Sequence, residues 1–79
     1  MEVVVFTSQR CGHCHRQKEW MEENKVKFIE KDVDLEVNKT EFINKGGRGT
    51  PLTIVTNGNE EKSILGFNKE LLNKVLNLE

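Results

Sequence analysis

The sequence predicts an α/β fold with about four strands and three helices in the order β-α-β-α-β-β-α. Short runs of β-branched residues, helix-forming stretches between the early runs, and an Asn-Gly pair between the last two runs indicate this order. We therefore expect a parallel strand pair followed by an antiparallel hairpin, with helices covering a mixed sheet. The length of 79 residues suits a single domain spanning residues 1–79.

The first half of the chain has the pattern of a strand–helix–strand unit. Residues 3–6 form a continuous β-branched run, so we expect a strand buried on both faces. Helix formers dominate from Cys11 to about Asn24, where Cys14, Lys18 and Met21 share one side at helical spacing. Residues 26–33 are predicted to form the second strand, and the parallel crossover should be right-handed.

A short second helix is predicted before the glycine-rich loop. Asp34 or Asn38 can cap a helix that runs to Lys45, and Gly46-Gly47 can end it. Its apolar residues are Val37, Phe42 and Ile43.

The last part of the chain has the pattern of a hairpin followed by a helix. Residues 52–55 and 61–65 are predicted strands, joined by Asn57-Gly58 in a turn with positive φ at both positions. Asn68 can cap the last helix. The apolar stripe of this helix consists of Leu71, Leu72, Val75, Leu76 and Leu78.

The charge balance and the N-terminal segment limit the classes of partner. The 12 Lys and Arg residues nearly offset the 13 Asp and Glu residues, which argues against binding nucleic acid or an acidic membrane through bulk charge. Near the N-terminus the longest apolar run is residues 3–6, far short of a signal-peptide core or a membrane span. We expect a cytoplasmic monomer.

The chain has 2 cysteines, Cys11 and Cys14, separated by two residues. A disulfide-stapled secreted domain would need four or more cysteines, so that class is excluded. A bridge closing so short a loop would contribute only about 2 kcal/mol in the chain-entropy model. Chemistry therefore explains the pair better than stabilisation does.

A cysteine pair at a predicted helix start favours reversible dithiol chemistry. Unpaired N–H groups and the helix dipole favour an anion at Cys11, which we expect to be the attacking nucleophile. Cys14, one turn inside, would be the resolving thiol. His13 can carry positive charge that favours the thiolate, and Gly12 keeps the spacer small and flexible.

Three other interpretations of this motif remain open. Residues 11–15 match the C-x-x-C-H haem-attachment pattern, although several strand patterns argue against a mainly helical haem pocket. Two cysteines and two histidines could bind zinc, but their spacing is cramped and no second knuckle exists. A pair of inert buried thiols is disfavoured because polar residues, Arg10 among them, surround Cys11.

Thr50-Pro51, which contains the single proline, is the second informative site. Proline is tolerated at the first residue of a strand, so a simple strand start would explain it. A cis peptide bond placed against the dithiol would instead leave the Thr50 backbone free to pair with a substrate strand.

Short motifs stand in a specific order over nearly the whole chain: residues 3–7, Cys11-Gly12-His13-Cys14 with Lys18 four residues on, residues 49–54, and Gly66-Phe67. Together they resemble the glutaredoxins and glutaredoxin-like redoxins of the thioredoxin superfamily. The resemblance implies a thioredoxin fold with strand order 2-1-3-4 and a cis Thr50–Pro51 bond. It also implies an enzyme, a dithiol–disulfide oxidoreductase acting on protein or glutathione mixed disulfides in electron transport and cell redox homeostasis.

Some residues depart from the usual glutaredoxin pattern. Gly-His between the cysteines looks like protein disulfide isomerase, and Ser8 stands where a lysine is common. Residues 66–68 look more like redoxins that donate electrons to ribonucleotide reductase and are recharged by thioredoxin reductase. The reductant would be glutathione or that enzyme, with no bound cofactor. A module carrying a metal, an iron–sulfur cluster or haem is the remaining alternative.

The expected substrate-binding residues gather around the dithiol and the proline. Arg48 could attract an anionic thiol substrate, and Phe67 could present an apolar contact. The full candidate set is Arg10, Gly12, Arg48, Thr50, Pro51, Gly66, Phe67 and Asn68.

Overall fold

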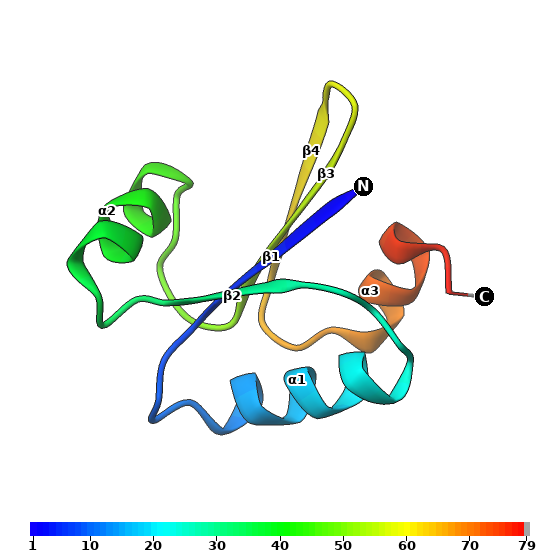
Figure 1. The fold of residues 1–79 in the computed structure, drawn as a ribbon, viewed down its shortest axis with the longest axis horizontal. Helices are drawn as coiled ribbons and strands as arrows, with labels where there is room; N and C mark the ends of the chain where they lie inside the picture. The colour runs from blue at the N-terminus through cyan, green and yellow to red at the C-terminus, as the bar shows by residue number, and fades with distance from the viewer. Residues whose placement is uncertain (79) are drawn as a thin grey trace.

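The computed structural model describes residues 1–78 and has the predicted element order (Figure 1). The elements are β1 (Glu2–Thr7), α1 (Gly12–Glu23), β2 (Ile29–Asp32), α2 (Glu36–Asn44), β3 (Leu52–Asn57), β4 (Glu60–Leu65) and α3 (Lys69–Leu76). The 4 strands form one mixed sheet in the order β2-β1-β3-β4. The predicted α/β class and the strand order implied by the resemblance are both confirmed.

The central strand β1 organises the sheet. It pairs in parallel with β2 and antiparallel with β3, and β3 pairs antiparallel with β4. All of β1 after Glu2 is buried, as predicted for a strand covered on both faces. Because the side chains of a strand alternate between faces, this one strand contributes to two separate cores.

The two faces of the sheet carry different helices (Figure 1). Val3 and Val5 face α1 and α3, where Met21 and Leu72 complete a core. The opposite face packs against α2 through a smaller cluster of apolar side chains. Its buried members are Val4, Phe6, Phe42, Leu52 and Ile54.

The second strand is shorter than the sequence predicts. It begins at Ile29 rather than Val26, because the chain leaving α1 stays bonded to the helix, with the Val26 N–H donating to the Met21 carbonyl at 2.9 Å. Val26 and Phe28 pack against the core before strand pairing starts.

The start of α2 also differs from the prediction. Leu35 occupies the N-cap position without a side-chain bond, so neither Asp34 nor Asn38 caps the helix. Asn38 instead donates to the Asp32 carbonyl at 3.0 Å. Among the three expected apolar residues of this helix only Phe42 is buried. Val37 and Ile43 are 76% and 58% exposed.

The hairpin turn lies one residue later than predicted. Asn57 pairs with Glu60, so the two loop residues are Gly58 and Asn59. Only Gly58 has positive φ, at 63°, which is the pattern of a type II′ rather than a type I′ turn. A single glycine at the first loop position is enough for this turn.

The last helix begins where predicted but differs at two predicted stripe positions: it ends at Leu76, so Leu78 lies outside it, and Leu71 is 40% exposed. Asn68 is its N-cap, and its side-chain oxygen accepts from the Leu71 N–H at 3.1 Å. Leu72 and Leu76 are its buried residues. Within residues 1–78, none of the helices has both the length and the apolarity needed to cross a bilayer.

Candidate active site

The two cysteines meet at the N-terminus of α1. Cys11 is the N-cap residue with extended backbone (φ −98°, ψ 104°), and its Sγ accepts a hydrogen bond from the Cys14 N–H at 3.1 Å. The two residues are joined by a disulfide, with their Cα atoms 5.2 Å apart. The predicted pairing at a helix start is therefore present.

The two sulfurs have unequal access to solvent. Cys11 is partly exposed, whereas Cys14 is fully buried. A backbone N–H directed at the Cys11 sulfur, together with the helix dipole, stabilises negative charge on that sulfur after reduction. The geometry thus separates an accessible sulfur that can hold charge from an inner sulfur shielded from water.

His13 lies on the exposed side of α1 and is bonded to Arg16. The Arg16 Nη2 donates to His13 Nδ1 at 2.9 Å, because a guanidinium can only donate. In this arrangement the permanent positive charge beside the motif belongs to Arg16, a residue that the sequence reasoning did not single out. The charge predicted for His13 remains a prediction.

The Thr50–Pro51 peptide bond is cis, as the resemblance implies. Pro51 precedes Leu52, which pairs with Phe6, so it lies at the end of the sheet where β1 leads into the dithiol loop. The Gly66 N–H donates to the Pro51 carbonyl at 2.8 Å, and Gly66 has a φ of 79° that favours glycine. Two of the predicted contact residues are therefore neighbours.

The other predicted contact residues have different surroundings. Phe67 is partly buried and packs edge-on against Trp20, with ring centroids 6.0 Å apart, and its predicted contact with substrate remains a prediction. The side chain of Asn68 is used as the helix cap. Arg10, Gly12 and Arg48 are exposed, and their predicted contacts with substrate remain predictions.

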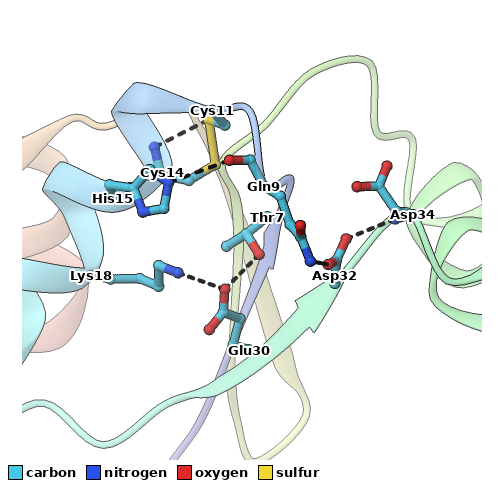
Figure 2. Close-up of polar contacts among 9 residues, drawn as sticks. All are labelled: Thr7, Gln9, Cys11, Cys14, His15, Lys18, Glu30, Asp32 and Asp34. Carbon is cyan, nitrogen blue, oxygen red and sulfur yellow. Dashed lines mark hydrogen bonds and ion pairs between the residues drawn. A yellow bond between two sulfur atoms is a disulfide. The ribbon is translucent and has the colours of Figure 1, made fainter.

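A pocket of about 550 Å³ lies beside the dithiol, between α1, β2 and the start of α2. Figure 2 shows its polar wall, where Lys18 from α1 and Thr7 from β1 both point at Glu30 on β2. The two distances to Glu30 Oε2 are 2.8 Å from Lys18 Nζ and 2.7 Å from Thr7 Oγ1. The hydrogen bond from Lys18 is the main cause that holds the pKa of Glu30 below its usual value, although partial burial opposes this shift.

The second carboxylate of this pocket belongs to Asp32. Its oxygens accept from the Gln9 side-chain amide at 3.3 Å and from the Asp34 N–H at 2.8 Å (Figure 2). Sequence reasoning missed Glu30 and Asp32 as site residues. The available signal was their spacing of two along the second strand, which places both side chains on one face.

Within residues 1–78, no group of three or more His, Cys, Asp or Glu side chains is placed to hold a metal ion.

Comparison with known proteins defines the family. The glutaredoxin family model matches residues 3–59, a span that contains both the dithiol and the Thr50–Pro51 pair. The chain belongs to the glutaredoxin family. Its CxxC pair and fold are those of a glutaredoxin-family thiol–disulfide oxidoreductase. A comparison with curated protein sequences finds no significant match.

Several solved structures share this glutaredoxin-family fold. NrdH-redoxin from Escherichia coli, a glutaredoxin-like protein, is 26% identical with a TM-score of 0.77, covering 95% of each chain. A glutaredoxin from Archaeoglobus fulgidus is also 26% identical, with a TM-score of 0.76 over 95% of this chain and 85% of that chain. A point mutant of the thioredoxin-like protein BC3987 has a TM-score of 0.84 at 22% identity, covering 95% of this chain and 99% of the other.

Proposed function

We propose that this protein reduces disulfide bonds in protein substrates, with Cys11 as the nucleophile and Cys14 as the resolving thiol. The observation that carries the proposal is the unequal exposure of the two sulfurs at the helix start. An incoming disulfide can reach Cys11, and the N–H of Cys14 stabilises negative charge there. Cys14 is shielded from solvent and lies within bonding distance of Cys11.

The proposed reaction consists of two exchanges that balance in electrons and protons. The Cys11 thiolate attacks one sulfur of the substrate disulfide, forming a mixed disulfide and releasing the first substrate thiolate, which takes a proton from solvent. Cys14 then loses its proton and attacks the Cys11 sulfur, which releases the second substrate thiol. Two electrons pass to the substrate, and the Cys11–Cys14 disulfide remains.

We further propose that a dithiol reductase, rather than glutathione, returns the protein to its reduced form. Three features support this choice: Ser8 replaces the common lysine, the pocket beside it has carboxylates at Glu30 and Asp32, and its Lys18 is already paired with Glu30. This side of the dithiol therefore offers the two carboxylates of glutathione no unpaired lysine among the residues that line the pocket. The similar NrdH-redoxin is described as having a thioredoxin-like activity profile.

Two cysteine variants test the catalytic roles. Cys11→Ser should abolish reduction of a model protein disulfide such as that of insulin, and the proposal fails if the normal rate persists. Cys14→Ser keeps the nucleophile but lacks the resolving thiol, so it should accumulate a mixed disulfide detectable by mass spectrometry of the intact protein.

A coupled assay tests the electron source. The oxidised protein is supplied with NADPH and either thioredoxin reductase or glutathione with glutathione reductase, and NADPH oxidation is followed in each arm. We expect turnover with thioredoxin reductase and little with glutathione. Faster turnover with glutathione would overturn the choice of reductant while leaving the dithiol mechanism intact.

A further inference from the structure

A buried glutamine lies on the face of α1 that carries Cys14. Gln17 is 0% exposed, and its side-chain Nε2 donates to Thr53 Oγ1 at 2.7 Å and contacts Met21 Sδ at 3.6 Å. Its other polar atom, Oε1, is buried and has no hydrogen-bond partner among the residues that the structure describes. Buried polar groups are almost always paired, so this oxygen requires an explanation.

The position of Gln17 relates it directly to the dithiol. Side chains three residues apart on a helix are neighbours, with Cβ atoms about 5–6 Å apart, and Cys14 and Gln17 are both buried on the same face. Across from this face, Thr53 stands on β3 opposite Val5, whose side chain belongs to the core that contains Met21. Gln17 therefore lies about one helical turn from Cys14 on the face of α1 that packs against the sheet.

Packing alone does not explain a glutamine at this position. A leucine or methionine would fill the space between α1 and β3 without burying an unpaired acceptor, although it would remove the donor that Thr53 Oγ1 accepts from. The other two buried residues of this helix, Cys14 and Met21, have apolar side chains without an amide or hydroxyl group. The bond to Thr53 accounts for Nε2, and a partner that appears in another state of the protein would account for Oε1.

Reduction of the disulfide creates such a partner. Two electrons and two protons from a dithiol reductant break the Cys11–Cys14 bond, and the reductant becomes a disulfide. The partly exposed Cys11 can release its proton to solvent, whereas the fully buried Cys14 keeps its proton as a thiol. The new S–H group is a hydrogen-bond donor that the oxidised protein does not contain.

We propose that Gln17 is a positioning residue for the resolving cysteine: its Oε1 accepts a hydrogen bond from the Cys14 thiol when the disulfide is reduced. Two buried polar groups that would each be unpaired then satisfy one another. The bond exists only in the reduced protein, so it favours that form and makes the disulfide a stronger oxidant. This role rests on the proposed dithiol function and adds a residue to it.

Vibrational spectroscopy of the thiol tests the contact directly. In Cys11→Ser, Cys14 is the single thiol, and its S–H stretching band in a Raman spectrum falls in frequency when the group donates a hydrogen bond. We expect a band below that of a reference alkanethiol in hexane, and a return to the reference frequency in the double variant Cys11→Ser with Gln17→Leu. A band at the reference frequency while Gln17 is present would overturn the proposal.

The redox equilibrium tests the consequence. We expect Gln17→Leu to lower the equilibrium constant for reduction by dithiothreitol about threefold to fivefold. At 29.6 mV per tenfold change, this is a potential about 14–21 mV more negative. Met21→Leu is the control for the other contact of the Gln17 amide: it removes the Sδ contact but keeps Oε1, and it should leave the constant within about twofold of the wild type. An unchanged constant in Gln17→Leu, or an equal change in the control, contradicts the role.

Both measurements are independent of turnover. If the wild-type protein reduces no protein disulfide, the proposed function fails, yet the S–H band and the equilibrium constant still report on Gln17. If the protein is active and Gln17→Leu changes neither quantity, only the role of Gln17 fails. Should Gln17→Leu fold poorly, the Raman band of Cys11→Ser alone decides the question.

Discussion

Gly47, in the loop that follows α2, is predicted to be intolerant of even one added methyl group. A Cβ at this position would overlap the Phe42 ring, with two further ring carbons at only 2.5 and 2.6 Å. Phe42 is 9% exposed and packs against Phe6 with ring centroids 5.6 Å apart. In Gly47→Ala the ring must therefore shift within the smaller of the two cores.

The expected cost follows from two opposing contributions. Overpacking a well-filled core costs about 1–3 kcal/mol. Alanine restricts the unfolded chain more than glycine does, which returns about 0.4–1 kcal/mol because Gly47 has no positive φ. The two ranges leave a net loss of about 0–2.6 kcal/mol, with a midpoint of about 1.3 kcal/mol. Each kcal/mol shifts the melting temperature of a domain this small by about 4–8 °C.

Thermal and urea unfolding followed by circular dichroism measure this loss. Gly49→Ala is the matched control, since a Cβ at Gly49 meets nothing within 4 Å, and it should be neutral or slightly stabilising. Adding Phe42→Leu should make Gly47→Ala less costly, because a smaller side chain relieves the overlap. The reasoning is refuted if Gly47→Ala and Gly49→Ala have the same stability.

Two more predictions concern single polar contacts, both measured by urea unfolding. The pKa of Glu30 is lowered in the folded protein, mainly by Lys18, so the stability from this pair is complete above the ordinary carboxyl pKa of 4.5 and is lost as the pH falls through the lower folded value. Lys18→Met should lower the free energy of unfolding by less than about 1 kcal/mol at neutral pH, because the ion pair is partly exposed. The difference between variant and wild type should vanish in acid, and a difference that does not depend on pH would contradict the prediction. Asn68→Ala should lower the free energy of unfolding by about 1 kcal/mol, because the N-cap of α3 is lost. Asn68→Gly should lower it by only a few tenths of a kcal/mol, and equal losses in the two variants would argue against capping.

The elements that sequence reasoning placed well are those with strong local patterns. The run from Val3 to Phe6 is apolar on both faces of a strand, so it is expected to be buried inside a sheet, and it forms the central strand. The last helix combines a side-chain cap at Asn68 with an apolar stripe, so its start and its buried residues Leu72 and Leu76 were predictable. The CxxC spacing likewise predicted that Cys11 and Cys14 meet at a helix start.

The errors occurred where the local pattern is weak. Helix α1 carries no clear apolar stripe, and the predicted side of Cys14, Lys18 and Met21 proved to contain Gln17 in place of the half-exposed Lys18. In α2, Val37 and Ile43 are as apolar as Phe42, yet only Phe42 faces the sheet. Which side of such a helix is buried depends on how it docks, and its own composition does not determine that.

The sequence by itself determined the order of elements, the glutaredoxin-like motif and the chemical identity of the dithiol, because these depend on residues close together in the chain. The tertiary structure decided the surroundings of that dithiol. Lys18 and Glu30 become partners only when β2 lies beside β1, and Gln17 meets Thr53 only when α1 docks on β3. Contacts between segments many residues apart require the packed fold, since no local propensity specifies which distant side chain will lie opposite.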